Sequence, residues 1–315
     1  MNNTSAIQAE DLSKHFGDIQ AVRGIRFDVH QGEIFSLLGP NGAGKSTTIS
    51  MLACLLKPSG GDAHVMGHSI IHEAMEVKRS IGVIPQEIAL YHDLTARENL
   101  NFWGKMYGLR GAALRQRVDE VLDIIGLADR QKGCVGTFSG GMKRRLNIGL
   151  ALLHRPQVII MDEPTVGIDP QSRRNILDKV KQLNQQGMTV LYTTHYMEEA
   201  QELSNHIAVM DQGQVIAYGT HDELVKIVGE QDRIDLTLNT EASRALECWR
   251  TLDGVHQVDT KNGKVTLLVD DSDFVLPRLF ETGARLGVRI TLVEIQRPNL
   301  EAVFLHLTGR ALRDA

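Results

Sequence analysis

Long apolar runs are absent from this 315-residue sequence. A membrane-spanning helix needs about 18 or more consecutive apolar residues, and the longest runs here fall far short of that length. The stretch from Met1 to Asp11 shows neither a positively charged start nor an apolar core, so no signal peptide is expected. These absences predict a chain that does not itself cross a membrane.

Cysteine and clustered positive charge are also scarce. The three cysteines, Cys54, Cys134 and Cys248, are odd in number, far apart and outside any metal-binding spacing, so a reduced, cytosolic compartment fits best. The formal net charge is −5 and no basic block stands out, which disfavours a sequence-independent grip on nucleic acid. The length suggests about two domains.

The most informative stretch is Gly39-Pro40-Asn41-Gly42-Ala43-Gly44-Lys45-Ser46-Thr47. The apolar run 34–38, broken only by Ser36, precedes it, and Ile49, Leu52, Ala53 and Leu56 follow with the spacing of a buried helix face. Strand, glycine-rich loop and helix together predict a phosphate-binding P-loop. Backbone N–H groups and the helix N-terminus would face the phosphates. Lys45 would reach the β- and γ-phosphates, and the Ser46 hydroxyl would bind Mg²⁺.

Polar side chains follow two further predicted strands. The apolar run 158–161 is typical of a strand buried in a parallel sheet, and it ends at Asp162 and Glu163. Because ligands lie at the carboxyl ends of such strands, we expect Asp162 to hold Mg²⁺ and Glu163 to orient or deprotonate an attacking water. The predicted strand 189–194 ends at His195, whose imidazole could contact the γ-phosphate or that water. A lone histidine at a strand end is more often structural.

Three weaker signals accompany these motifs. Phe16, in a predicted turn at 14–17, could pack in the core or offer a stacking surface to adenine, and the sequence favours neither. Gln86 follows a predicted strand at 81–84 and by itself indicates only a solvated strand end. Ser139 is a predicted helix N-cap followed by Gly140 and Gly141. Two glycines in a first helical turn suggest that the backbone approaches an anion closely, although an ordinary loop-to-helix junction is the simpler interpretation.

Taken in this order, the P-loop, Gln86, Ser139-Gly140-Gly141, Asp162-Glu163 and His195 resemble the ATP-binding cassette (ABC) family over roughly residues 5–225. In that family two cassettes pair head to tail, so the signature of one chain contacts the γ-phosphate held by the other. The resemblance implies a role for each residue. Phe16 stacks on adenine, Gln86 touches Mg²⁺ and water and signals to a transmembrane partner, and Ser139 to Met142 form the signature. Asp162 is the Walker B aspartate, Glu163 the catalytic glutamate, Asp169 the D-loop aspartate and His195 the switch histidine.

Two signature positions depart from the usual pattern, because Met142 replaces Gln and Phe138 replaces Leu. Met142 followed by the basic run 143–145 looks like exporter-type cassettes. A helix is predicted at 298–309, with Asn299 as its N-cap and Gly309 as its stop. This ending resembles the tail of ATP-binding subunits of ABC-2-type exporters of drugs, lipids and polysaccharides. The resemblance therefore implies ATP and Mg²⁺ as cofactors. It implies two partners, a separately encoded integral membrane ABC-2-type permease and a second copy of this chain, and it places the chain on the cytoplasmic face of the inner membrane.

A non-transport ABC ATPase acting on ribosomes or nucleic acid is the alternative. Such proteins usually carry two cassettes or a long coiled coil between the motifs, whereas this chain has one cassette and about fifty residues between Gln86 and Ser139. Its negative charge also disfavours that alternative.

The expected fold class is α/β: a P-loop NTPase cassette at 1–228, with a RecA-like core, an antiparallel β subdomain and a helical subdomain at about 87–150. A capping box at 95–98 opens the first helix of that subdomain. An accessory domain is expected at 229–315. Alternating apolar residues at 234–238 and 265–269 predict strands there, with further strands near 255–258 and 288–293 and helices at 242–252 and 274–286. The order β-α-β-β-α-β predicts a small α+β, ferredoxin-like domain.

Overall fold

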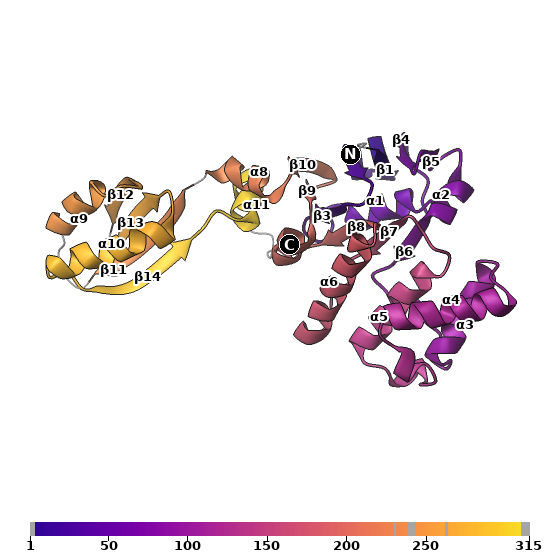
Figure 1. Ribbon diagram of the computed structural model, residues 1–315. Helices are drawn as coiled ribbons and strands as arrows, with labels where there is room; N and C mark the ends of the chain where they lie inside the picture. Colours follow the sequence, from indigo (N-terminus) through magenta and orange to yellow (C-terminus); the bar gives the residue numbers. More distant parts are fainter. Residues whose placement is uncertain (1–3, 230, 239–242, 262–263, 310–315) are drawn as a thin grey trace. The chain divides into compact units, whose positions relative to one another are not determined.

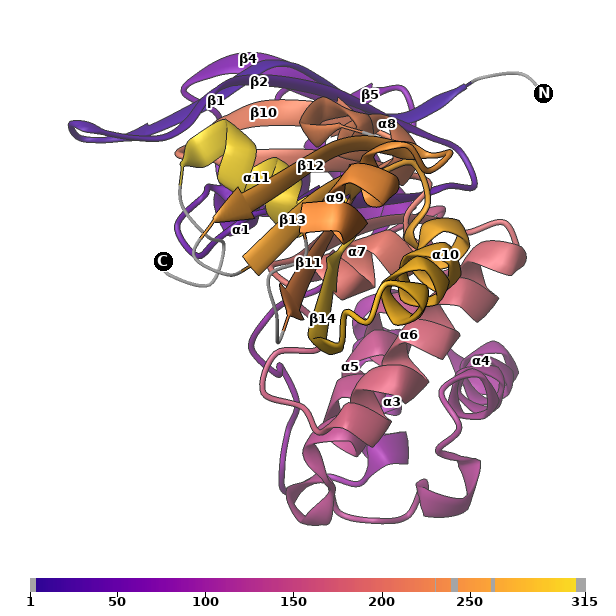
Figure 2. The same cartoon turned by 90° about the vertical axis from the view of Figure 1, so that its left-hand side faces the viewer.

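The computed structural model describes residues 4–229, 231–238, 243–261 and 264–309 (Figures 1 and 2). Two compact units divide them, one ending at His221 and one from Asp222 onward. The sequence predicted a domain boundary after residue 228, a few residues beyond this division between the units, and that boundary stays a prediction. Among the described residues, none of the helices combines the length and the apolar character that crossing a bilayer requires.

A six-stranded sheet in the order β10-β9-β3-β8-β7-β6 forms the centre of the first unit. Five strands run parallel, and β10 joins through an antiparallel hairpin with β9. Every residue of β3, β7 and β8 is buried, as expected for the middle of a parallel sheet with both faces covered. The strands are β3 (Ile34–Leu38), β6 (Ile81–Ile84), β7 (Val158–Asp162), β8 (Thr189–Thr194), β9 (His206–Asp211) and β10 (Gln214–Gly219).

Two hydrophobic cores cover the two faces of this sheet. One core joins the central sheet to helix α1 (Lys45–Leu52) and to an antiparallel sheet in the order β2-β1-β4-β5. The other core joins it to the helices that follow β6. The remaining elements of the first unit are β1 (Ser5–Phe16), β2 (Ile19–His30), β4 (Gly60–Val65), β5 (His68–Ser69), α2 (Ala74–Ser80), α3 (Ala96–Met106), α4 (Gly111–Ile124), α5 (Gly140–Leu152), α6 (Pro170–Gln185) and α7 (Met197–Leu203), with short 3-10 turns at Ala128–Arg130 and Val135–Thr137.

Local signals predicted several helix starts correctly. The capping box that opens α3 is present, since the Thr95 side chain accepts the Glu98 N–H and the Glu98 side chain accepts the Thr95 N–H. Ser139 caps α5, as predicted, by accepting the N–H of Met142. Each cap satisfies helical N–H groups that would otherwise lack a partner.

Two boundaries predicted from the sequence are wrong. The turn expected at 14–17 is shorter, because β1 continues to Phe16 and pairs with Ile19 at the start of β2. The register of this pairing is irregular between Ala9 and His15, so the strand carries no simple alternation that would reveal its full length. Helix α1 ends at Leu52, so Leu56 lies beyond it. Cys54 there has a left-handed φ of 54°, which a helix cannot accommodate.

The second unit has the predicted β-α-β-β-α-β order. Its antiparallel sheet is arranged β12-β13-β11-β14, and one core joins the sheet to α9 and α10, with Trp249 fully buried. Asn299 caps the last helix and Gly309 ends it with a left-handed φ, both as predicted. The elements are α8 (His221–Val225), a 3-10 turn at Lys226–Val228, β11 (Asp232–Leu238), α9 (Ser243–Arg250), β12 (Val255–Lys261), β13 (Lys264–Val269), α10 (Ser272–Arg285), β14 (Ile290–Gln296) and α11 (Leu300–Thr308).

The separate core of the second unit predicts that it can be destabilised without weakening the first. Leu267 is fully buried on β13, so Leu267→Ala should lower the unfolding free energy of this unit by about 2–5 kcal/mol. Fluorescence of Trp249 in a Trp103→Phe background reports the second unit, and fluorescence of Trp103 in a Trp249→Phe background reports the first.

The matched control is Leu305→Ala, which removes a half-exposed leucine of the same unit and should change stability by less than about 0.5 kcal/mol. An equal shift of the Trp103 and Trp249 transitions in Leu267→Ala would show that the two units unfold as one.

Candidate functional site

The P-loop connects β3 to α1 at the carboxyl edge of the central sheet. Gly42 and Gly44 have φ values of 79° and 101°, which lie in the left-handed region that favours glycine. A Cβ on Gly39 would lie 2.1 Å from the carbonyl oxygen of Met210 on β9. Only glycine therefore fits at the position where the loop leaves β3. Asn41 and Gly42 are exposed at its tip, as is Ser46 in the first turn of α1. Helical N–H groups at such a start favour an anion.

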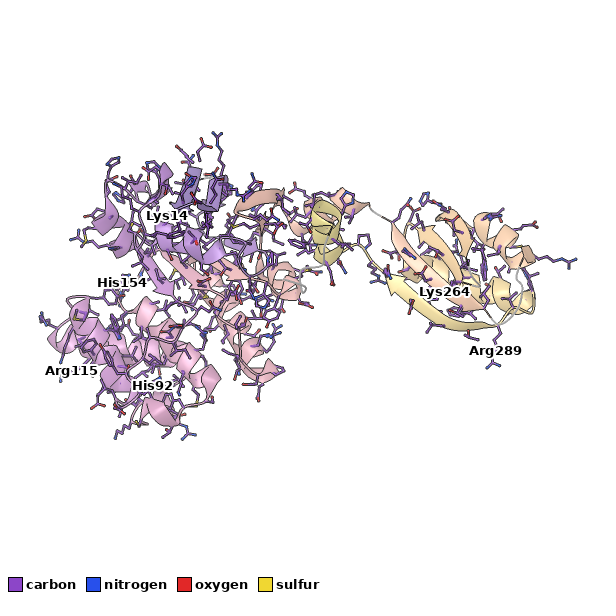
Figure 3. All side chains as sticks on the ribbon, turned by 180° about the vertical axis from the view of Figure 1, so that it is seen from behind. Lys14, His92, Arg115, His154, Lys264 and Arg289 are labelled. Atoms are coloured by element: carbon purple, nitrogen blue, oxygen red, sulfur yellow. The ribbon has the colours of Figure 1, made fainter. Side chains whose placement is uncertain are left out.

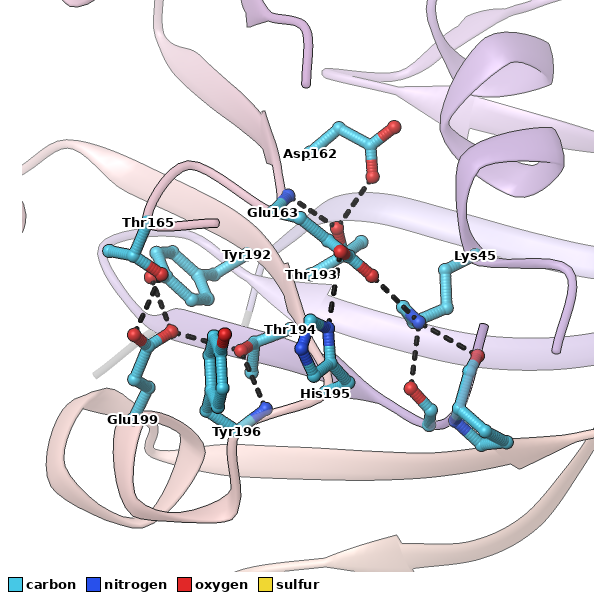
Figure 4. A network of polar contacts seen from close by, with 12 residues as sticks. Lys45, Asp162, Glu163, Thr165, Tyr192, Thr193, Thr194, His195, Tyr196 and Glu199 are labelled. Carbon is cyan, nitrogen blue, oxygen red and sulfur yellow. Dashed lines mark hydrogen bonds and ion pairs between the residues drawn. The ribbon is translucent and has the colours of Figure 1, made fainter. Parts of the chain in front are cut away.

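Lys45 reaches back across the loop to a carboxylate of another strand. Its ammonium donates to the carbonyl oxygens of Gly39 at 2.7 Å and Pro40 at 2.9 Å. The same nitrogen lies 2.9 Å from Glu163 Oε1, and the two side chains are only 4% and 5% exposed (Figure 4). A buried charge is tolerated when opposite charge and hydrogen bonds surround it, and here each group supplies part of what the other needs.

Thr193 on β8 fixes both acids that end β7. Glu163 has a left-handed φ of 43°, a conformation that costs a non-glycine residue of order 1–3 kcal/mol unless its surroundings hold it. Its N–H donates to the carbonyl oxygen of Thr193 at 3.2 Å and to the hydroxyl at 3.0 Å. That hydroxyl donates in turn to Asp162 Oδ1 at 2.7 Å. Thr193 therefore fixes both the backbone of Glu163 and the side chain of Asp162.

His195 follows β8 directly and contacts the other oxygen of Glu163. The distance from His195 Nδ1 to Glu163 Oε2 is 3.2 Å, and Figure 4 shows the imidazole on one side of the carboxylate and Lys45 on the other. Three residues singled out in the sequence, from three different segments, thus meet at one carboxylate. This juxtaposition arises because β3, β8 and β7 are neighbours in the sheet.

The signature glycines differ from each other. Gly140 is exposed with open space around it, whereas a Cβ on Gly141 would lie 2.1 Å from the Ser172 hydroxyl on α6. Packing of α5 against α6 thus gives Gly141 a reason that is independent of any anion, and the close approach of both glycines to an anion stays a prediction. Ser172 also donates its N–H to Asp169, the N-cap of α6, at 2.9 Å. Hydrogen bonds from the Ser172 N–H and hydroxyl lower the pKa of the Asp169 carboxyl below its ordinary value.

The side chains of Phe16 and Gln86 are both exposed to solvent in this structure. Phe16 is 48% exposed at the end of β1, so the alternative that it packs in the core is wrong. The ammonium of Lys14, which is labelled in Figure 3, lies 5.2 Å from the centroid of its ring. Gln86 follows β6, and its side chain makes no hydrogen bond to a described residue, while its carbonyl oxygen accepts one from Arg144.

Arg144 is a residue that the sequence analysis missed. It lies in α5 only five residues after Ser139, is 3% exposed, and donates to the carbonyl oxygens of Pro85 at 2.8 Å and Gln86 at 2.7 Å. Burial lowers the pKa of its guanidinium below the ordinary value. Arg144, the middle residue of the basic run taken as a mark of the subclass, thus ties the signature helix to the segment after β6. A charged run is usually a solvated helix face, so no local pattern indicated this contact.

The contacts of Thr193 lead to a prediction about its hydroxyl. Thr193→Val keeps the shape of the side chain but leaves the Glu163 N–H and the Asp162 carboxylate each short of a partner, which should cost about 1–3 kcal/mol of unfolding free energy. Urea unfolding measures the loss, and the backbone amide of Glu163 should exchange its hydrogen faster than in the parent chain.

Thr189→Val is the matched control at the other end of the same strand. Its buried hydroxyl accepts the N–H of Gly32 at 2.9 Å, so a similar loss of stability is expected without faster exchange at Glu163. Equal exchange at Glu163 in the two variants would contradict the assignment.

Comparison with known proteins gives a consistent result. Residues 22–166 match the family model described as ABC transporter. The chain is 48% identical to a linearmycin resistance ATP-binding protein of Bacillus subtilis (strain 168), over 98% of this chain and 100% of the relative. It is 39% identical to a daunorubicin/doxorubicin resistance ATP-binding protein of Streptomyces peucetius, over 99% and 94%. It is 36% identical to a Nod factor export ATP-binding protein of Cupriavidus pinatubonensis, over 99% and 93%.

Solved structures agree with these relatives. An ATP-binding subunit of an ABC transporter superposes with a TM-score of 0.64 at 30% identity, covering 71% of this chain and 93% of that one. A dimeric ATP-binding cassette bound to ADP and phosphate in a post-hydrolysis state superposes with a TM-score of 0.61 at 28% identity, covering 68% and 98%. The predicted family and fold class are thereby confirmed, and the chain belongs to the ABC transporter family, whose ATP-binding domains are ATPases coupled to transport.

Proposed function

We propose that this chain is the ATP-hydrolysing subunit of an ABC-2-type exporter, working as a head-to-tail pair of cassettes on the cytoplasmic face of the inner membrane. The observation that carries the proposal is the meeting of Lys45 and His195 at the Glu163 carboxylate. It is supported by sequence identities of 48%, 39% and 36%, each over nearly the whole chain, to ATP-binding proteins of drug resistance and Nod factor export. Those relatives favour export over the ribosomal or nucleic-acid alternative.

In this proposal the chain's own residues divide the work of hydrolysis. Lys45 and the N–H groups of residues 39–47 hold the β- and γ-phosphates, and Phe16 stacks on adenine. When Lys45 transfers its contact to the γ-phosphate, Glu163 Oε1 becomes free to accept a proton from the attacking water. His195 holds the other carboxylate oxygen and orients that water. Ser139 and Gly140 of the second copy complete the phosphate contacts, and Gly141 shapes the start of that helix. Asp169 belongs to the D-loop, which faces the second copy.

The residues present fit a magnesium ion. Asp162 is 8% exposed, and within the described part of the chain its Oδ1 alone accepts a side-chain hydrogen bond, from Thr193. Ser46 lies exposed on the first turn of α1. No group of three or more His, Cys, Asp or Glu side chains in the described part of the chain could hold a metal. Mg²⁺ usually keeps several waters and is bound through one or two carboxylates plus substrate phosphates, so the Asp162 carboxylate, with Ser46 and Gln86, would suffice. The ion would neutralise charge on the phosphates.

An apolar surface on the helical subdomain is our candidate for the permease contact. Tyr91 and Phe102 are exposed and pack edge to face with ring centroids 4.9 Å apart, and Met106 is 69% exposed on the same helix as Phe102. Exposed apolar groups that cluster in this way mark interaction sites. They lie on α3 and in the segment that leads to it from Gln86, the residue with the implied signalling role.

The first prediction of the proposal concerns Glu163. Glu163→Gln should abolish turnover while ATP binding is retained, because the amide cannot accept the proton. A tagged Glu163→Gln chain purified in mild detergent with ATP and Mg²⁺ should bring a stoichiometric polytopic membrane protein, identified by mass spectrometry. Lys45→Ala is the control, since it should lose about 1.5–3 kcal/mol of ATP binding and with it the ATP-dependent association. Normal turnover in Glu163→Gln would refute the assigned base, and capture of ribosomal proteins or nucleic acid alone would refute export.

The second prediction concerns the apolar surface. Replacing Phe102 and Met106 by Ser should reduce co-purification of the membrane protein several-fold without changing ATP affinity, because these side chains lie outside the phosphate site. Met75→Ser removes a similarly exposed apolar side chain from α2 and should leave co-purification unchanged. Equal loss in both variants would show that the contact lies elsewhere.

A further inference from the structure

A second buried carboxylate lies beside the catalytic group and has no part in the hydrolysis described above. Glu199, in the first turn of α7, is 2% exposed. Three hydroxyls donate to it: Thr165 to Oε1 at 2.7 Å, and Tyr192 and Thr194 to Oε2, both at 2.9 Å (Figure 4). The guanidinium of Arg173 lies 3.6 Å from Oε1. Anchoring a seven-residue helix does not require so many charge-assisted contacts.

The partners of Glu199 come from three segments that carry predicted site residues. Thr165 lies two residues after Glu163, Thr194 directly precedes His195, and Arg173 stands in the first turns of α6, whose N-cap is Asp169. Thr194 accepts the N–H of Tyr196 at 2.9 Å through the same hydroxyl that donates to Glu199. The carboxylate therefore fixes the chain on both sides of His195.

Ring contacts of Tyr196 continue the connection to the imidazole. The guanidinium of Arg173 lies 4.3 Å from the centroid of the Tyr196 ring, and the centroids of Tyr196 and His195 are 4.2 Å apart. Burial raises the pKa of the Tyr192 phenol well above its ordinary value, and the negative charge of Glu199 adds to the shift. Tyr192 thus remains a hydrogen donor throughout the physiological pH range.

We propose that Glu199 is a positioning residue for hydrolysis: it joins the loop after Glu163, the end of β8 and the start of α6, and so sets the contact between Glu163 and His195. This inference rests on the proposed roles of those two residues. Glu199 itself touches neither nucleotide nor water in this account. It acts by holding Thr165 and Thr194, so its loss should impair turnover rather than nucleotide binding.

The test is Glu199→Gln in the full chain. The amide oxygen can still accept from Tyr192 and Thr194, but the amide nitrogen cannot accept from Thr165 and no longer pairs with Arg173. Because misplacement of about 1 Å can cost on the order of 100-fold in rate, we expect kcat to fall about 10- to 100-fold with the ATP dissociation constant unchanged within about twofold. Thr165→Val removes the same link, so the double variant should be no slower than the slower single variant.

Two further variants keep the inference open to refutation. Glu202→Gln changes the same residue type on the same helix, where the side chain pairs with Arg174 and Lys181 near the surface, and kcat should not change. Tyr192→Phe removes a single donor and should lower kcat less than Glu199→Gln. If Glu199→Gln does not fold, Thr165→Val and Tyr192→Phe carry the same measurement.

The outcomes separate this inference from the proposed function. Turnover that persists in Glu163→Gln refutes the assigned base, and the positioning role with it. Loss of turnover in Glu163→Gln together with normal kcat in Glu199→Gln and Thr165→Val refutes only the positioning role. ATP affinity that falls in proportion to kcat would show that Glu199 merely supports the fold.

Discussion

Burial of the Glu163 carboxylate against Lys45 and His195 is the constraint on which the rest of the site depends. A carboxylate and an ammonium removed from water are stable only where geometry and further hydrogen bonds satisfy them. The central sheet provides that geometry, because β3, β8 and β7 are adjacent and parallel and so deliver the P-loop, His195 and Glu163 to one edge. Backbone carbonyls of the P-loop complete the contacts of the ammonium, and the Thr193 hydroxyl holds the backbone N–H of Glu163. Electrostatic preorganisation of this kind is what lowers the barrier of a phosphoryl transfer.

Around this carboxylate, glycines that leave space for neighbouring atoms matter as much as the side chains that make contacts. Gly39 leaves room for the carbonyl of Met210, and Gly141 leaves room for Ser172. The second contact holds the signature helix against the start of α6, while Arg144 holds the same helix to the segment after β6. The signature is thereby tied, within one chain, to the loop that bears Asp169 and to the segment that bears Gln86. Movement of any one of these segments would therefore displace the others, which suits the proposed pairing of two cassettes.

The second unit depends on different interactions. Its core is formed by one face of an antiparallel sheet and two helices, and none of the proposed catalytic residues lies in it. Trp249, fully buried, donates its indole N–H to the carbonyl of Leu279, so the polar atom of the largest core side chain is satisfied within the unit. The unit therefore has the packing of an independent domain.

What the sequence by itself determined were features that depend on neighbours a few residues away. The P-loop, the caps at Thr95, Ser139 and Asn299, the buried strand before Asp162 and the β-α-β-β-α-β order of the second unit all follow from local spacing and short-range hydrogen bonds. Only the tertiary structure decided the exposure of Phe16, the need for Gly141, the burial of Arg144 and the contacts of Glu199. Each of these depends on a segment far away in the chain, as when Ser172 closes on Gly141 or Thr165 reaches Glu199 across 34 positions. Periodicity in one segment carries no information about such partners, because it is the order and pairing of the strands that bring them together.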